Sequence, residues 1–236
     1  MSLFKEVPYV NTWIFNTKGL SNSEWKSSIK MLGGVAAVRM VPGRSQNGSL
    51  CRFNCGEKES LGHVLGGCRH NEQLIDLRHN TIRSMIAEEL RSIGWTCHEE
   101  INCINLDGST QRIDIICFKD DKKNAFILDP TIRMEYDHGD AKEHQADIVN
   151  KEKGDKYKGA IPFFQREYGI EEIEIIGLYI GARGTIVSFF ENFRKKFGLS
   201  KDFVKTIVIE TLKGSVRILH NHIHSVGNNM ATRVNQ

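Results

Sequence analysis

Two aspartates, Asp114 and Asp129, end two apolar runs in the stretch Gln111–Glu135. If residues 120–123 form a four-residue loop, the runs pair as a symmetric hairpin that places the aspartates directly opposite each other on one face. Like charges in that position destabilise a sheet unless a cation neutralises them, and Mg²⁺ binds carboxylate oxygens. The spacing therefore indicates a divalent metal site. The alternative is a shifted register that leaves both aspartates as ordinary polar strand ends.

The two strands of this hairpin are apolar on both faces. The symmetric register pairs Phe118 with Ala125 and Ile116 with Ile127. One face would then carry Ile113, Ile115, Cys117, Phe126 and Leu128, and the other Ile116, Phe118 and Ile127. Strands that are apolar on both sides lie in a sheet that is covered on both faces. The aspartates are therefore expected inside the protein and not on a surface hairpin.

Three cysteines and a histidine between residues 51 and 68 follow the spacing C-x3-C-x7-H-x4-C. Two thiols on a tight turn, followed by a histidine and a thiol about one helical turn apart, can surround Zn²⁺ tetrahedrally. The predicted ligands are Cys51, Cys55, His63 and Cys68, and His70 is a competing ligand that fits the spacing less well. The segment has little apolar content, so the metal would supply its folding energy. The alternative is that the cysteines are simply buried in a larger domain.

The bulk composition excludes several classes of protein. The chain has 236 residues, of which 40% are hydrophobic, and a mean hydropathy of −0.35. No apolar run approaches the roughly 20 residues of a membrane-spanning helix, and the first 16 residues lack the order of a signal peptide. We expect an intracellular protein, in which the cysteines are metal ligands or buried residues and not disulfides. The net charge of +3 is compatible with a nucleic-acid partner but does not require one.

Periodic apolar positions predict the elements that position these residues. Helices are expected over residues 21–32, 72–93, 140–157, 186–197 and 200–224, and strands over 95–104 and 171–180 beside the hairpin. This order predicts an α/β fold. Residues 1–48 would form an N-terminal linker segment with one helix, residues 49–70 a separate zinc knuckle, and residues 71–236 the main domain with a helical C-terminal extension.

In their order, these parts resemble the C-terminal region of site-specific non-LTR retrotransposon polyproteins, where a zinc knuckle precedes a restriction-like endonuclease of the PD-(D/E)xK superfamily. The resemblance covers about residues 24–197. It depends on CRFNC…H…C, the RHN at Arg78–Asn80, RIDII, ILDPTIRME, KEKGDKY and IGARGT. It implies a restriction-endonuclease-like core, in which a central mixed sheet is flanked by helices. Two positions depart from the superfamily pattern: no proline precedes Asp114, and Thr131 stands where a lysine would follow Asp129. In this retrotransposon group a lysine on the following helix can serve instead, and Lys153 and Lys156 match.

The resemblance implies a metal-dependent DNA endonuclease that nicks target DNA, with structural Zn²⁺ and catalytic Mg²⁺ or Mn²⁺. Asp114 and Asp129 would hold the catalytic ion. A helix lysine would act beside them, and we favour Lys153 because Lys156 lies nearer the end of its helix. The same resemblance implies DNA and possibly RNA as partners, a location in the nucleus, and a reverse transcriptase domain that is absent from this chain.

Further site residues are predicted with their alternatives. Contacts to nucleic acid are assigned to Arg52, Arg78, His79 and Arg183. Arg183 precedes a helix whose first amides can face a phosphate, although a solvated arginine in a turn explains it equally well. Glu99 or Glu100 can add a metal ligand or be surface charges. Two rival functions stay open: a catalytically inactive knuckle fragment that binds nucleic acid, and a zinc-stabilised interaction domain.

Overall fold

A four-stranded mixed sheet forms the centre of the protein. A computed structural model describes residues 3–44, 48–136 and 144–231 of the chain. The strands are β1 (Thr96–Ile104), β2 (Thr110–Phe118), β3 (Asn124–Arg133) and β4 (Glu172–Gly181). They lie in sequence order, with β1–β2 and β2–β3 antiparallel and β3–β4 parallel. The α/β class and the central mixed sheet are confirmed.

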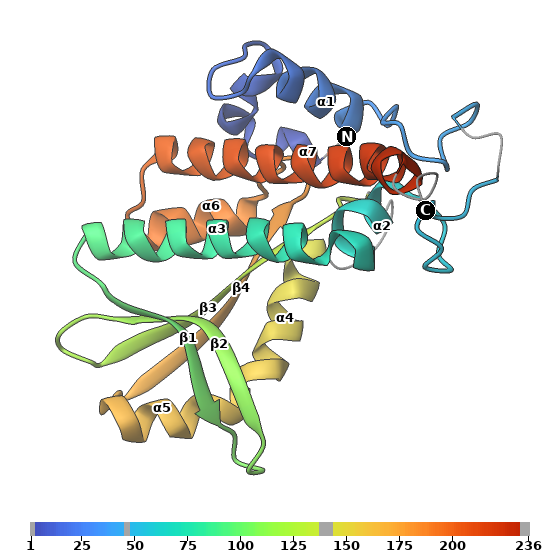
Figure 1. Ribbon diagram of the computed structural model, residues 1–236. Helices are drawn as coiled ribbons and strands as arrows, with labels where there is room; N and C mark the ends of the chain where they lie inside the picture. The colour runs from blue at the N-terminus through green and yellow to red at the C-terminus, as the bar shows by residue number, and fades with distance from the viewer. Residues whose placement is uncertain (1–2, 45–47, 137–143, 232–236) are drawn as a thin grey trace.

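Helices cover both faces of this sheet (Figure 1). One face packs against α3 (Glu72–Ser92), α6 (Ser188–Phe197) and α7 (Lys201–Ala231), and the other against α4 (Gln145–Tyr157) and α5 (Ile161–Tyr168). Helix α1 (Asn22–Leu32) lies on the outer side of α7. Helix α2 (Leu61–Gly66) belongs to residues 49–70, which carry the predicted zinc ligands and which we call the Cys/His segment. Short 3-10 turns span Leu3–Lys5, Pro8–Ile14, Arg69–Asn71 and Lys158–Ala160. Within the described ranges, no helix is both long and apolar enough to cross a membrane.

The predicted elements agree with the structure to within one or two residues at most boundaries. Ser21 caps α1, because its side chain accepts from the Glu24 amide while the Glu24 carboxylate accepts from the Ser21 amide. The helix predicted from residue 140 begins at Gln145, and residues 137–143 lie outside the described part of the chain. Helix α5 was not predicted from the sequence, because eight residues are too few for a helical period to show.

The β2–β3 hairpin has the predicted register, but its two inner strands separate at the aspartates. The ladder between them ends at the pair Ile115 and Leu128. Beyond that pair β3 continues with β4 and β2 continues with β1. Figure 1 shows β2 turning toward the foot of the picture while β3 and β4 run on toward the upper end of α4. We call this opening the strand fork, with Thr110–Asp114 on one arm and Asp129–Arg133 on the other.

The predicted assignment of Ile113 to a sheet face is wrong. Ile113 lies in the cluster under α5, whereas Ile115 lies in the cluster under α3. Residues two apart on a regular strand face the same way, so the backbone turns over between them, at Asp114. The neighbouring strand supplies the reason. Glu100 has φ of +57°, and the β1–β2 ladder skips the pair that Glu100 and Asp114 would make.

The Cys/His segment, predicted as a separate knuckle, packs against the C-terminal helix. Leu61, Val64 and Leu65 of α2 share an apolar cluster with Val216, Ile218 and Leu219 of α7. Arg52 donates to the Ile223 carbonyl, and Asn71 and Asn221 are hydrogen-bonded through their side chains. The segment therefore has apolar support from α7 in addition to any metal that it binds.

Gly177 of β4 fixes the position of α4. A Cβ at this residue would lie 2.8 Å from the Val149 carbonyl oxygen and 2.8 Å from Cγ of Lys153. Overpacking of this kind costs about 1–3 kcal/mol. We therefore expect Gly177→Ala to lower the free energy of unfolding by that amount in chemical denaturation. Gly154, on α4 itself, has open space at its Cβ position.

Gly154→Ala is the matched control. Replacing a glycine inside a helix stabilises it by about 0.5–1 kcal/mol, so this variant should be as stable as the parent or more so. Equal effects of the two alanine substitutions would contradict the close packing of α4 on β4.

Candidate functional site

A cavity of about 660 Å³ opens at the strand fork. Its walls come from both arms of the fork, from α3 and α4, and from Gly62 and Gly66 of α2. The charged side chains that line it are Asp76, Arg78, His79, Glu100, Arg112, Asp114, Asp129, Arg133, Lys153 and Lys156. The predicted acidic pair and both predicted lysines therefore meet in one cavity, although they come from three elements.

Asp129 is the buried centre of this cavity, with 2% of its surface exposed. Its Oδ2 lies 2.8 Å from Nζ of Lys153 and accepts a hydrogen bond of 2.7 Å from the Tyr157 hydroxyl. Thr131 donates to its other oxygen at 3.0 Å. Lys153 and Tyr157 stand one turn apart on α4 and so face the sheet together. Burial and then the charge of Asp129 raise the pKa of Tyr157, which keeps its hydroxyl a donor.

Lys156 lies farther from the carboxylate than Lys153. Its Nζ is 3.9 Å from Oδ2 of Asp129 and donates at 2.7 Å to the Tyr157 hydroxyl. Its side chain is 46% exposed, against 17% for Lys153. Lys153 is therefore the lysine in direct contact with the acidic group.

Asp114 forms an ion pair with His79 of α3, with 3.1 Å between Oδ2 and Nε2. Burial alone would raise the pKa of Asp114, but the hydrogen bond and charge of His79 outweigh it and lower this pKa. Burial likewise would lower the pKa of His79, but the contact with Asp114 raises it. Both directions favour the charged pair. His79, predicted to contact nucleic acid, thus lines the cavity and holds one of the two aspartates.

The fork alone offers a divalent ion two carboxylates. Within the described ranges, the sets of three or more His, Cys, Asp or Glu side chains close enough for one ion lie around Cys51, and one of them includes His222 of α7. Mg²⁺ commonly binds one or two carboxylates and completes its shell with water and substrate phosphate oxygens. Asp114 and Asp129, which line one cavity, are the carboxylates considered for that mode. Glu99 contacts Arg83, Arg91 and Ser84, outside the cavity.

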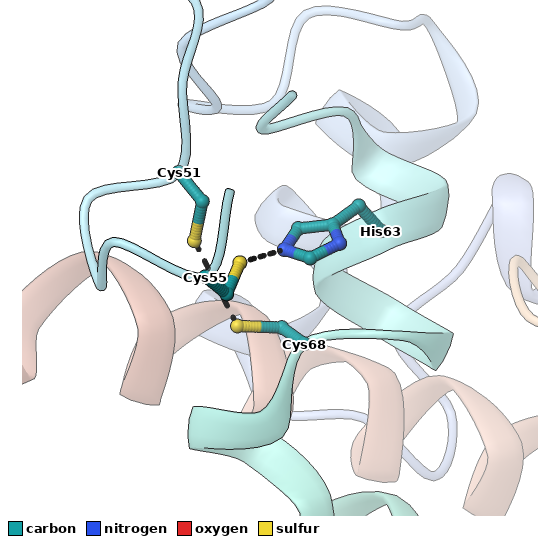
Figure 2. A group of neighbouring side chains, drawn as sticks. All are labelled: Cys51, Cys55, His63 and Cys68. Atoms are coloured by element: carbon teal, nitrogen blue, oxygen red, sulfur yellow. Dashed lines mark hydrogen bonds between the residues drawn. The ribbon is translucent and has the colours of Figure 1, made fainter. Parts of the chain in front are cut away.

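The four predicted zinc ligands converge on one point (Figure 2). The sulfurs of Cys51 and Cys68 are 3.8 Å apart, Cys55 Sγ is 3.1 Å from Nε2 of His63, and all four ligand atoms lie within 4.8 Å of one another. Tetrahedral ligands with Zn–S bonds of about 2.3 Å are separated by about 3.8 Å. The donor set fits a metal ion such as zinc.

His222 of α7 is a neighbour of this centre that the sequence analysis missed. Its Nε2 lies 3.8 Å from Sγ of Cys51 and 3.2 Å from Oε2 of Glu59, and Cys51, Glu59 and His222 form a second set close enough for one ion. All three are buried. Burial lowers the pKa of His222 to about 4, so the ring is neutral. No local pattern links residue 222 to residue 51, because only the fold of α7 brings them together.

Arg52 and Arg78, predicted to contact nucleic acid, are held inside the protein. Arg52 donates to Glu59 at 2.6 Å and to the Ala37 carbonyl. Burial would raise the pKa of Glu59, but Arg52 outweighs this and lowers it to about 2. Arg78 is 3% exposed and donates to Ser215 and to the Leu65 carbonyl, at 2.8 Å each. These guanidinium groups join the Cys/His segment and α3 to their neighbours.

Arg183 is also paired within the chain. Its Nε lies 3.1 Å from Oε2 of Glu135, its backbone amide donates to Oε1 of the same residue, and its side chain is 18% exposed. Glu135 packs against Gly181, where a Cβ would lie 2.2 Å from Oε1. The turn after β4 is therefore built around this carboxylate.

The metal centre generates the first prediction for this site. The purified chain should contain about one zinc ion, and Cys55→Ser should lose it and melt at a lower temperature, because three ligands bind zinc more weakly than four. Elemental analysis and thermal melts measure both. Cys103 is a buried thiol outside the centre, so Cys103→Ala should keep the zinc. A metal-free parent chain would rule out a zinc centre.

The His79–Asp114 pair generates a prediction for pH dependence. The raised pKa of His79 means that its stabilisation is complete below about pH 6.5 and is lost as the pH rises through that raised value. The lowered pKa of Asp114 means that its stabilisation is lost only below pH 3.8. The stability difference between the parent and His79→Gln should thus peak near pH 5 at about 1 kcal/mol and shrink by pH 9. Denaturation at these pH values measures it. A constant difference would mean that the pair is not ionic.

Comparison with known proteins identifies relatives of the chain. No family model matches it. It is similar to retrovirus-related Pol polyproteins of the type-1 retrotransposable element R2 from Popillia japonica, with 30% identity over 114 residues, 24% over 182 and 28% over 113. These matches cover 48%, 73% and 47% of this chain but only 16%, 35% and 18% of the respective polyproteins. The chain is therefore homologous to a part of the R2 retrotransposon Pol polyprotein.

Proposed function

We propose that this chain is a metal-dependent DNA endonuclease domain derived from a retrotransposon. The observation that carries the proposal is the meeting of Asp114, Asp129 and Lys153 in one cavity. Two carboxylates beside a lysine suit phosphodiester hydrolysis, which needs a cation, an activated water and a positive charge near the leaving group. Homology to the R2 Pol polyprotein and the order of motifs support a nucleic-acid substrate.

The two aspartates would hold Mg²⁺ or Mn²⁺. The bound ion would lower the pKa of a water and neutralise charge on the scissile phosphate. The charges of Lys153 and Lys156 help to hold Asp114 ionised, and the Tyr157 hydroxyl restrains Asp129. These contacts keep the carboxylate oxygens of Asp114 and Asp129 available as metal ligands inside the cavity.

We assign to Lys153 the role of orienting the attacking water or of stabilising the developing negative charge. It reaches the buried carboxylate from α4, which Gly177 holds close to β4. With an ion on the carboxylates, its ammonium group can turn from Asp129 toward a phosphate oxygen. Lys156 reaches the same oxygen only at 3.9 Å and is assigned a supporting role.

The Cys/His segment is proposed to hold structural Zn²⁺ and to form one side of the cavity through α2. DNA is the proposed partner, with RNA as a further candidate. Since the chain spans a minor part of its relatives, we propose that a reverse transcriptase domain and a location in the nucleus belong to the complete polyprotein context.

A second function has one observation in its favour. Both aspartates already have cationic partners in the protein, Asp114 with His79 and Asp129 with Lys153. A divalent ion must displace or rearrange these partners. If it cannot, the chain is an inactive nucleic-acid-binding domain in which the ion pairs replace the metal.

Nicking of supercoiled plasmid tests the enzymatic proposal. The parent chain should nick DNA with Mg²⁺ or Mn²⁺ and not with EDTA. Asp129→Asn should abolish nicking, because it removes a ligand of the divalent ion. Lys153→Ala should lower the rate about 10²–10³-fold, because it removes positive charge at the reacting phosphate. Lys156→Ala should lower the nicking rate less than Lys153→Ala does.

Asp155→Asn is the matched control, because Asp155 lies on α4 but is 63% exposed and pairs with the exposed Lys158. It should nick like the parent. Thermal melts establish that each variant is folded. Activity that survives Asp129→Asn, or a folded parent that never nicks, would leave the inactive binding domain as the function.

A further inference from the structure

We propose that Arg112 and Arg133, one on each arm of the strand fork, bind backbone phosphates of the DNA next to the one that is cut. This inference rests on the proposed nuclease function and deepens it by assigning the substrate contacts. Both arginines line the cavity that holds Asp114 and Asp129. Neither belongs to the residues that the sequence analysis assigned to nucleic acid.

Arg112 is the exposed cation of the β2 arm. It precedes Asp114 by two residues, and its side chain is 63% exposed. Its Nη1 lies 2.7 Å from Oε2 of Glu100, and Arg83 contacts the other oxygen of Glu100. Glu100 keeps a left-handed backbone, with φ of +57°. Backbone strain of this kind concentrates at functional sites, and Glu100 lines the cavity where it contacts Arg112.

Arg133 is the corresponding cation of the β3 arm. It follows Asp129 by four residues, its side chain is 40% exposed, and its Nη2 lies 2.5 Å from Oε2 of Glu152 on α4. Residue numbers fall along β2 and rise along β3 from the end of their ladder, since the strands are antiparallel. Both arginines therefore lie on the open side of the fork, beyond the two aspartates.

The chemistry of these two groups suits phosphate. A guanidinium group binds phosphate oxygens through two parallel hydrogen bonds. The glutamate partners are 30% and 46% exposed, and ion pairs that are open to solvent contribute little to stability. A phosphate can therefore replace either glutamate at little cost. Arg52, Arg78 and Arg183 cannot rearrange in this way, because their partners are buried.

The remaining cations of the cavity complete the path. Lys153 contacts Asp129, and Lys156, which is 46% exposed, also lines the cavity. A DNA strand that places one phosphate at the two aspartates would continue over Arg112 and Arg133. The acidic pair would select the phosphate to be cut, and the arginines would hold its neighbours.

The test measures binding of duplex DNA with Ca²⁺ in place of Mg²⁺, at several salt concentrations. Each lost phosphate contact should reduce the slope of log affinity against log salt by about one. Arg112→Gln and Arg133→Gln should each show this reduction and weaken binding about tenfold. Arg112→Lys keeps the charge and should keep the slope. Arg166→Gln is the matched control, because Arg166 is 71% exposed and ion-paired but lies on α5, outside the cavity.

The outcomes separate the two proposals. Slopes that stay unchanged in both glutamine variants, in a parent chain that binds and nicks DNA, overturn the arginine assignment and leave the nuclease. Reduced slopes in a parent chain that binds DNA but never nicks it support the arginine contacts and overturn the nuclease. A folded parent chain that does not bind DNA overturns both.

Discussion

The pairing of β3 with two different strands is the constraint on which the rest of the site depends. β3 keeps its parallel partner β4 from end to end, but keeps β2 only as far as the pair Ile115 and Leu128. The sheet therefore splits between its inner strands. The split leaves Asp114 and Asp129 at its apex and makes room for a cavity inside an otherwise apolar core.

Charge inside that cavity is balanced by the helices. Burying the Asp129 carboxylate without partners would destabilise the fold. Helix α4 supplies Lys153 and Tyr157 as these partners. Asp114 receives His79 from α3 on the other side. Each aspartate thereby has a cationic partner without a bound metal, so the same groups that stabilise the fold are those that a divalent ion and a phosphate would engage.

The Cys/His segment and the fork are connected through α7 and α2. Arg52 and His222 tie the segment to the last helix, while Arg78 of α3 donates to a carbonyl of α2 and to Ser215. His79, the next residue of α3, holds Asp114. A change at the Cys/His centre therefore has a short path of direct contacts to the acidic pair.

The sequence by itself determined what depends on local spacing: the hairpin register, the four converging Cys/His ligands and most element boundaries. Period-two apolar runs and short ligand spacings permit few geometries. Only the tertiary structure decided which side chain neutralises which. In the folded chain Arg78 is buried, Arg112 lines the cavity and His222 lies beside Cys51. Such pairings join residues far apart in the chain, and their energies depend on burial, which no local pattern records.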